Sequence, residues 1–182
     1  MLPIAPLMIE HRLIEKMIKV IKTGVERSAR QGKINPEFID LAVDFIRLYA
    51  DRCHHGKEED ILFRDLNKKP LSAEHKRIMD ELIEEHRQGR RTVADLVEAK
   101  KGYINEQEGA LSLILDRLKF LTDFYPKHIE KEDRHFFIPV MNYFSREEKE
   151  AMLQEEWEFD KNLIHQTYQN RIREAEKLVG GD

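Results

Sequence analysis

The sequence HGKEEDILF at residues 55–63 returns in altered form as HIEKEDRHFF at residues 128–137. Each copy places a glutamate four residues after a histidine, followed by an aspartate and then phenylalanine: His55 with Glu59, and His128 with Glu132. Residues four apart on an α-helix lie on the same face, so each pair offers one imidazole and one carboxylate to a single point. Two such pairs on separate helices indicate a shared polar site in a helical core.

Apolar residues at helical spacing surround both segments and predict a chain of five helices. The expected helices run from about Leu7 to Gly32, from Pro36 to Leu66, from Ser72 to Gly102, from Leu111 to about Met141, and onward from Ser145. Ser72 can cap the third helix, and Ser145 with Glu148 forms a capping box. The sequence therefore predicts an all-α fold: an up-down-up-down four-helix bundle over residues 1–144, with a C-terminal helix over residues 145–182 packed on its outside.

The composition argues against several classes of protein. The 182 residues suffice for one domain, and 31 basic and 35 acidic residues are mixed along the chain, giving a formal charge of −4. Without a basic stripe, we expect no nucleic-acid partner and no membrane surface. Pro3 and Pro6 interrupt the apolar start, so we expect neither a signal peptide nor a spanning helix, and a cytoplasmic location. Cys53 is the single cysteine, so a metal here would take nitrogen and oxygen ligands.

Two further histidines fall on the inward faces of predicted helices. His11 keeps the register of Ile14, and His86 keeps that of Leu82. When the helices are folded back at their turns, one level of the bundle collects His11, His55, Glu59, His86, His128 and Glu132. Burying such groups unpaired would cost about 2 to 7 kcal/mol each, which a metal would compensate. Imidazoles and carboxylates suit iron, manganese or zinc, and two carboxylates able to bridge indicate a dinuclear site.

This set of residues resembles the hemerythrin-like (HHE cation-binding) family over roughly residues 7 to 141. The matching motifs are the lone His11, His-x3-Glu-Asp from His55, Glu85-His86-Arg87, and His-x3-Glu-Asp from His128. The resemblance implies a four-helix bundle with two iron ions and an open coordination position for O2 or a similar small ligand. It also implies the following ligand roles: His11 and His55 on one iron, His86 and His128 on the other, and Glu59 and Glu132 as bridges.

The sequence departs from the oxygen-carrying hemerythrins at one position. Those proteins have a second histidine one turn from the first on the third helix, where this chain has Leu82 and Arg90. A fifth imidazole is therefore expected to be missing, and its place could be taken by Glu58, His54, His75, His135 or water. His54 is expected to point sideways from the core, one position off the inward stripe. An additional exchangeable position would favour redox chemistry over simple reversible binding.

Three functions are compatible with these residues. The leading hypothesis is a di-iron protein that binds or senses O2 or a related small ligand, namely NO or peroxide. The second is a redox enzyme that reduces peroxide or NO at the same centre, which steady turnover would reveal. The third is a metal-free helical interaction domain, which predicts no stoichiometric metal. Trp157 and Tyr168 are expected to pack the C-terminal helix onto the bundle, and this helix could also contact a second copy or a protein partner.

Overall fold

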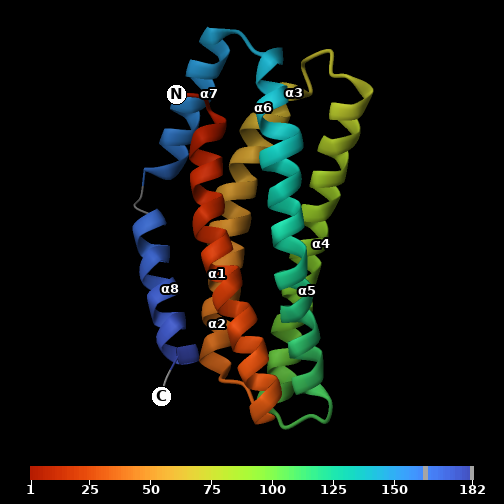
Figure 1. Ribbon diagram of the computed structural model, residues 1–182, viewed down its shortest axis with the longest axis vertical. Helices are drawn as coiled ribbons and strands as arrows, with labels where there is room; N and C mark the ends of the chain where they lie inside the picture. Colours follow the sequence, from red (N-terminus) through yellow and green to blue (C-terminus); the bar gives the residue numbers. More distant parts are fainter. Residues whose placement is uncertain (162–163, 181–182) are drawn as a thin grey trace.

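The computed structural model describes residues 1–161 and 164–180, and every regular element within these residues is a helix (Figure 1). Four long rods form the bundle, and the second and fourth rods contain π-helical segments. The elements are α1 (Ile4–Gln31); α2 (Pro36–Asp44), η1 (Phe45–His55), η2 (Glu58–Phe63) and α3 (Arg64–Leu66); α4 (Ala73–Ile104); α5 (Ala110–Lys131), η3 (Glu132–Phe136), α6 (Phe137–Val140) and η4 (Met141–Tyr143); α7 (Arg146–Asp160) and α8 (Ile164–Gly180). The expected all-α bundle with a C-terminal extension is confirmed.

The helix ends follow from local chemistry. The Asn35 side chain accepts a hydrogen bond from the amide of Glu37 at 2.9 Å, and Pro36 occupies the first turn of α2. Ser72 caps α4, and Ser145 forms the predicted capping box at the start of α7. These caps satisfy amide groups that the first helical turn leaves without partners, so the short connections of the bundle are set by the sequence near each turn.

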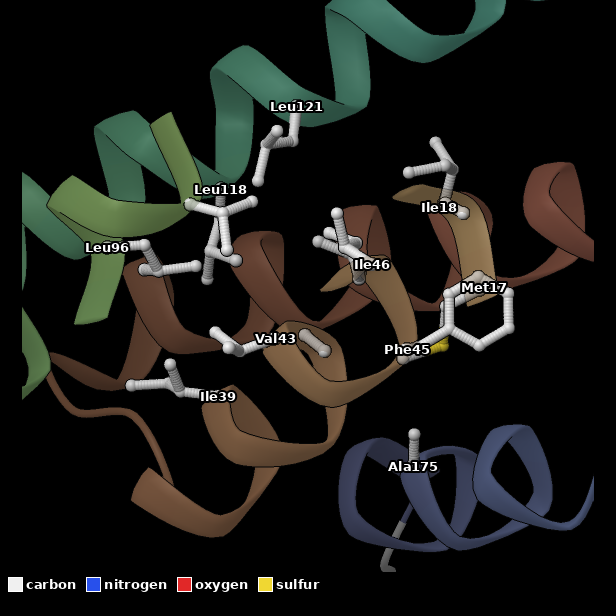
Figure 2. Close-up of a cluster of buried hydrophobic side chains, with 14 of the residues drawn as sticks. Met17, Ile18, Ile39, Val43, Phe45, Ile46, Leu96, Leu118, Leu121 and Ala175 are labelled. Carbon is white, nitrogen blue, oxygen red and sulfur yellow. The ribbon is translucent and has the colours of Figure 1, made fainter. Parts of the chain in front are cut away.

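Two apolar clusters fill the bundle, one toward each end. Figure 2 shows part of the larger cluster, to which α1, α2, η1, α4, α5 and α8 all contribute side chains. The smaller cluster contains Leu7, Leu62, Leu82 and Phe136 from the four rods. On every rod, buried polar residues lie where the two clusters meet: residues 10–11, 54–55, 57–58, 86, 128 and 132. The apolar clusters thus enclose a polar layer that crosses all four rods.

The π-helical segments change which residues of the second rod face inward. A 3.6-residue period predicts Leu48 on the inward face, but Leu48 is 38% exposed and Tyr49 is 1% exposed. In a π-helix each hydrogen bond spans five residues instead of four, so the wider turns of η1 shift the inward face by about one position. The predicted register is therefore wrong at Leu48 and at Glu59, while Leu62 and Leu66 are buried as expected, and the shift affects the residues of the polar layer.

The C-terminal extension consists of two helices, α7 and α8, where the sequence predicted one. Figure 1 shows both helices along the outer side of the bundle, where α8 contacts α1 and α2 and α7 contacts η2. Tyr168 is buried as expected, but Trp157 is 54% exposed, so its predicted packing role is wrong. Residues 162–163 and 181–182 of the predicted extension lie outside the described residues. None of the described helices is both long and apolar enough to cross a membrane.

Candidate metal centre

Seven buried side chains meet in the polar layer. Each is at most 2% exposed, and together they come from all four rods: His11 (α1), His54 and His55 (η1), Glu58 (η2), His86 (α4), His128 (α5) and Glu132 (η3). They form two sets whose ligand atoms lie within 4.8 Å of one another. We name them the His–Glu group (His11, His54, Glu58, Glu132) and the three-histidine group (His55, His86, His128). Each set has the size and chemistry of a metal site.

All five imidazoles are oriented in the same way, with Nδ1 outward and Nε2 toward the interior. Each Nδ1 lies against a carboxylate oxygen: His11 to Asp133 at 2.7 Å, His54 to Glu10 at 2.7 Å, His55 to Asp51 at 3.3 Å, His86 to Glu59 at 2.7 Å, and His128 to Glu85 at 2.7 Å. Because a carboxylate only accepts hydrogen bonds, each Nδ1 carries a proton and donates it. In the neutral imidazole, Nε2 then presents a lone pair to the interior, which is the usual arrangement of metal-bound histidines.

The two buried glutamates each reach both groups. One oxygen of each carboxylate faces the His–Glu group and the other faces the three-histidine group. The distances to Nε2 atoms are 3.6 Å from Glu58 to His54, 3.4 Å from Glu58 to His86, 3.1 Å from Glu132 to His11, and 3.1 Å from Glu132 to His128. Both carboxylates are therefore placed to serve two cations at once.

The inward donor atoms lack hydrogen-bond partners, and this tests whether a metal fits. Among the described residues, the partnerless buried atoms include Nε2 of His55, His86 and His128 and all four carboxylate oxygens of Glu58 and Glu132. The remaining two, Nε2 of His11 and Nε2 of His54, lie 2.9 Å apart, so one must be protonated unless a cation lies between them. Leaving such groups unsatisfied costs about 1 to 3 kcal/mol each. Cations in this layer would satisfy all of them.

The pKa shifts of the buried side chains in the layer also favour a bound cation. Burial, together with the negative charge of Glu132, raises the pKa of Glu58 well above its ordinary value. Burial, reinforced by the neighbouring His11, lowers the pKa of His54 to about 4, so this imidazole is neutral near pH 7. Against the effect of burial, the charge of Glu132 raises the pKa of His128 to about 9, so without a metal this imidazole balances the carboxylate by holding a proton. A divalent cation would take over that role and stabilise the two carboxylates together.

The structure places the predicted glutamate of the second rod elsewhere. Glu59 is half-buried on the outer side, where its carboxylate accepts hydrogen bonds from His86 Nδ1 and from Arg90 at 2.8 Å. Glu58 is fully buried and occupies the interior position. The five other predicted residues do lie in the layer: His11, His55, His86, His128 and Glu132. The shift by one residue follows from the π-helical turns, which a 3.6-residue period does not anticipate.

The same shift brings both histidines of the second rod inward. His54 was expected to point sideways, but it is 1% exposed and lies against His11. His55 stacks on His86 with ring centroids 3.9 Å apart, so it belongs with His86 and His128 and not with His11. The layer therefore holds five imidazoles, and the fifth, expected to be missing, is supplied by η1. The signal was present in the sequence, since His54 and Glu58 also form a His-x3-Glu pair.

The outer side of the His–Glu group is closed by a buried ion cluster. Glu10, which holds His54, also forms an ion pair with Lys57, and Lys57 Nζ donates to Asp160 of α7 at 2.7 Å. Lys57 and Glu10 are both fully buried. His165 of α8 is only partly exposed, and its Nδ1 lies 2.7 Å from the hydroxyl of Tyr49. The C-terminal helices thus cover this side of the layer.

The three-histidine group lies beside a cavity. A space of about 490 Å³ is lined by His55 and His86, by the ring of Tyr125 and by residues of η1 and α4. His128 is not part of its lining. The two groups therefore differ in access, because one is covered by α7 and α8 and the other borders an open space.

Comparison with known families gives a match over nearly the whole chain. Residues 2–175 match the family model described as the hemerythrin HHE cation-binding domain. The chain belongs to this hemerythrin family. Searches of curated proteins and of solved structures each returned no match. Membership of the hemerythrin family and the inward His and Glu side chains together indicate a metal-binding protein.

Proposed function

We propose that this hemerythrin-family chain holds two iron ions, one at each group, and binds a small ligand such as O2, NO or peroxide there. The observation that carries the proposal is the orientation of the layer: five Nε2 atoms and two carboxylates point inward, and each carboxylate faces both groups. His11 and His54 would hold one ion, and the three-histidine group would hold the other. Glu58 and Glu132 would be shared.

Iron is the metal that we propose for this donor set. Neutral imidazoles and carboxylates without a thiolate suit iron, and manganese and zinc share these ligand types. Cys53 is buried on η1, where its thiol donates a hydrogen bond to Asp160 at 3.3 Å, so it is committed elsewhere. Iron in such a pair supplies a position that binds a diatomic ligand and electrons that can reduce it.

The unequal number of imidazoles supports a small ligand at the His–Glu group. That group offers two imidazoles against three at the other, and the two carboxylates beside it also reach His86 and His128 of the three-histidine group. The ion with fewer protein donors retains more room for an exogenous ligand. Because Lys57, Asp160 and the C-terminal helices cover this side, only a small molecule would reach it. Reversible binding or sensing is therefore the function that the geometry supports best.

The chain's own residues would tune this ligand position in two ways. The outer carboxylates fix the tautomer of every imidazole and increase its basicity, which strengthens metal binding. The apolar clusters above and below the layer exclude bulk water and so strengthen each electrostatic contact within it. Because His54 supplies the fifth imidazole, the argument for redox chemistry from a missing imidazole no longer applies. The alternative of a redox enzyme is then decided by whether the protein turns over peroxide or NO.

Metal content and absorption spectra test the proposal. The full-length chain is purified without oxygen, its metals are quantified, and its spectrum is recorded before and after exposure to O2 and after O2 removal. We expect about two iron ions per chain and charge-transfer bands that appear with O2 and disappear when it is removed.

A matched pair of variants separates the site from the rest of the protein. His54→Ala should lose iron, whereas His75→Ala should retain it, since His75 pairs with Tyr143 outside the layer. Protein without stoichiometric metal would refute the proposal, and so would zinc as the resident ion or equal iron in the two variants. Sustained consumption of peroxide or NO would instead favour the enzyme.

A further inference from the structure

The cavity beside the three-histidine group is much larger than a diatomic ligand requires. Its volume is about 490 Å³, within the range of about 300 to 1,000 Å³ that pockets for organic molecules occupy. A water molecule, by comparison, takes up about 30 Å³ of the liquid. The small-ligand position proposed above also lies at the other group. The cavity is thus available for a different occupant.

The inner wall of the cavity is largely apolar. Ile46 of η1, Val93 of α4 and Tyr125 of α5 line it, and all three side chains are at most 3% exposed. Gly89 of α4 also lines it and adds no side chain, which widens the space at that turn. An apolar body of several carbon atoms would be removed from water here, gaining about 0.8 kcal/mol for each buried methylene group.

The rim of the cavity carries two arginines without partners. Arg47 and Arg52, both on η1, are exposed and make no hydrogen bond or ion pair with any described residue. Arg90 differs, because it is bound to Asp51 and Glu59 at 2.7 and 2.8 Å. An unpaired guanidinium is suited to a carboxylate, which it can bind through two parallel hydrogen bonds.

Among the described residues, the lining of the cavity also carries one acidic side chain without an ion pair. Asp60 lines the cavity and forms no ion pair with any described residue, while the other acidic side chains of the wall are held by Arg90. Over the whole lining, three arginines balance three carboxylates. The preference for an anion therefore rests on the two guanidinium groups that have no partner among the described residues, against one carboxylate that has none.

We propose that this cavity binds an organic carboxylate with an apolar body, about the size of a medium-chain fatty acid. Its carboxylate would lie between Arg47 and Arg52, and its chain would pack against Ile46, Val93 and Tyr125. The proposal goes beyond the proposed function, because it assigns a second ligand to the opposite side of the layer. It does not require O2 chemistry, since every residue it uses is an outer neighbour of the metal layer.

Calorimetric titration of the full-length, metal-loaded chain tests the proposal with octanoate as the probe. Octan-1-ol and octylamine share its apolar chain, and inorganic phosphate carries negative charge without that chain. We expect octanoate to bind at least about tenfold more tightly than each of these three, a difference of about 1.4 kcal/mol. Equal affinity for octylamine would overturn the charge assignment, and equal affinity for phosphate would overturn the apolar part.

Three variants locate the binding in the cavity. The double substitution Arg47→Gln and Arg52→Gln should weaken octanoate binding by about tenfold or more, whereas Arg134→Gln, which loses an exposed pair with Glu130, should not. Gly89→Leu should abolish binding by filling the cavity, and a Cβ there meets only Phe124, at an ordinary 3.8 Å.

Iron content and helix content are measured on the same samples. If the double variant and Gly89→Leu both bind octanoate as the native chain does, the inference is wrong. Because iron is quantified separately, a failure here is distinguishable from failure of the proposed function.

Discussion

The two sides of the polar layer contrast in access and in coordination. At the His–Glu group, two imidazoles are covered by the buried cluster of Glu10, Lys57 and Asp160 and by the C-terminal helices. At the three-histidine group, one more imidazole is present, and His55 and His86 line a cavity. The side with fewer imidazoles is thus the covered one. The C-terminal extension therefore limits which molecules reach the His–Glu group, the group with two imidazoles.

The largest expected effect is on metal affinity, and it distinguishes the interior Glu58 from its neighbour Glu59. Glu58→Gln removes the charge that both groups share, and we expect the affinity for metal to fall about 1,000-fold or more, equivalent to about 4 kcal/mol. Glu59→Gln removes only an outer partner of His86, and such changes cost about 10- to 100-fold. Competition with a chelator of known affinity measures both. Equal losses in the two variants would contradict the placement of Glu58.

The second prediction concerns the buried ion cluster that covers the His–Glu group. Lys57→Met leaves Glu10 and Asp160 without their buried ammonium partner, and we expect the free energy of unfolding to fall by about 3 kcal/mol or more. Lys68→Met is the control, because Lys68 is exposed and pairs only with Asp65. Urea denaturation at a fixed iron concentration compares the two. A loss below 1 kcal/mol for Lys57→Met would mean that this cluster does not hold α7 in place.

The third prediction concerns pH and the buried carboxyl of Glu156 on α7. Burial, opposed by the charge of Lys57, raises the pKa of Glu156 to about 8 from an ordinary value near 4.5. The folded chain therefore binds this proton more tightly than the unfolded chain. The contribution of the protonated Glu156 to the free energy of unfolding is complete at low pH and is lost as the pH rises from about 4.5 to 8. Between pH 5 and pH 9, the free energy of unfolding of Glu156→Gln should rise relative to that of the native chain by on the order of 1 to 3 kcal/mol.

Thermal or urea unfolding at several pH values measures this difference. Glu158→Gln, on the exposed face of the same helix, serves as the control and should show no such trend, because its partner Lys161 is also exposed. A constant difference between Glu156→Gln and the native chain across the range would show that Glu156 is ionised in the fold throughout.

The smallest effect is expected at an exposed contact between α3 and α7. Arg64 holds Glu155 of α7 through two hydrogen bonds of 2.7 and 3.0 Å, but both side chains are largely exposed. Such pairs contribute about 0.2 to 1 kcal/mol. A double-mutant cycle with Arg64→Met and Glu155→Gln measures the coupling. A coupling free energy larger than that between Lys57 and Asp160 would contradict the expectation that buried contacts hold α7 in place.

The helices and their caps could be predicted because their causes are local. Pro36, Ser72 and the pair Ser145 and Glu148 act within one turn of the helix that each begins. The positions of His11 and His86 were likewise predictable, since α1 and α4 are regular helices in which a 3.6-residue period holds throughout.

The register of the second rod could not be predicted in the same way. Its π-helical turns hold more residues than an α-helical turn, so a 3.6-residue period assigned Glu59 and Leu48 to the wrong face. The buried charges were missed because Lys and Glu are rarely found fully buried without partners. Glu10 nevertheless lies three residues after Leu7 and four before Ile14, a spacing that indicates the inward face.

Anomalous diffraction at the iron edge, from crystals of the iron-loaded chain, tests the central claim most directly. The account predicts two separate peaks, one beside His11 and His54 and one among His55, His86 and His128, with Glu58 and Glu132 reaching toward both. A single peak would contradict it. So would peaks that contact Glu59 in place of Glu58, or an empty layer in protein that contains iron.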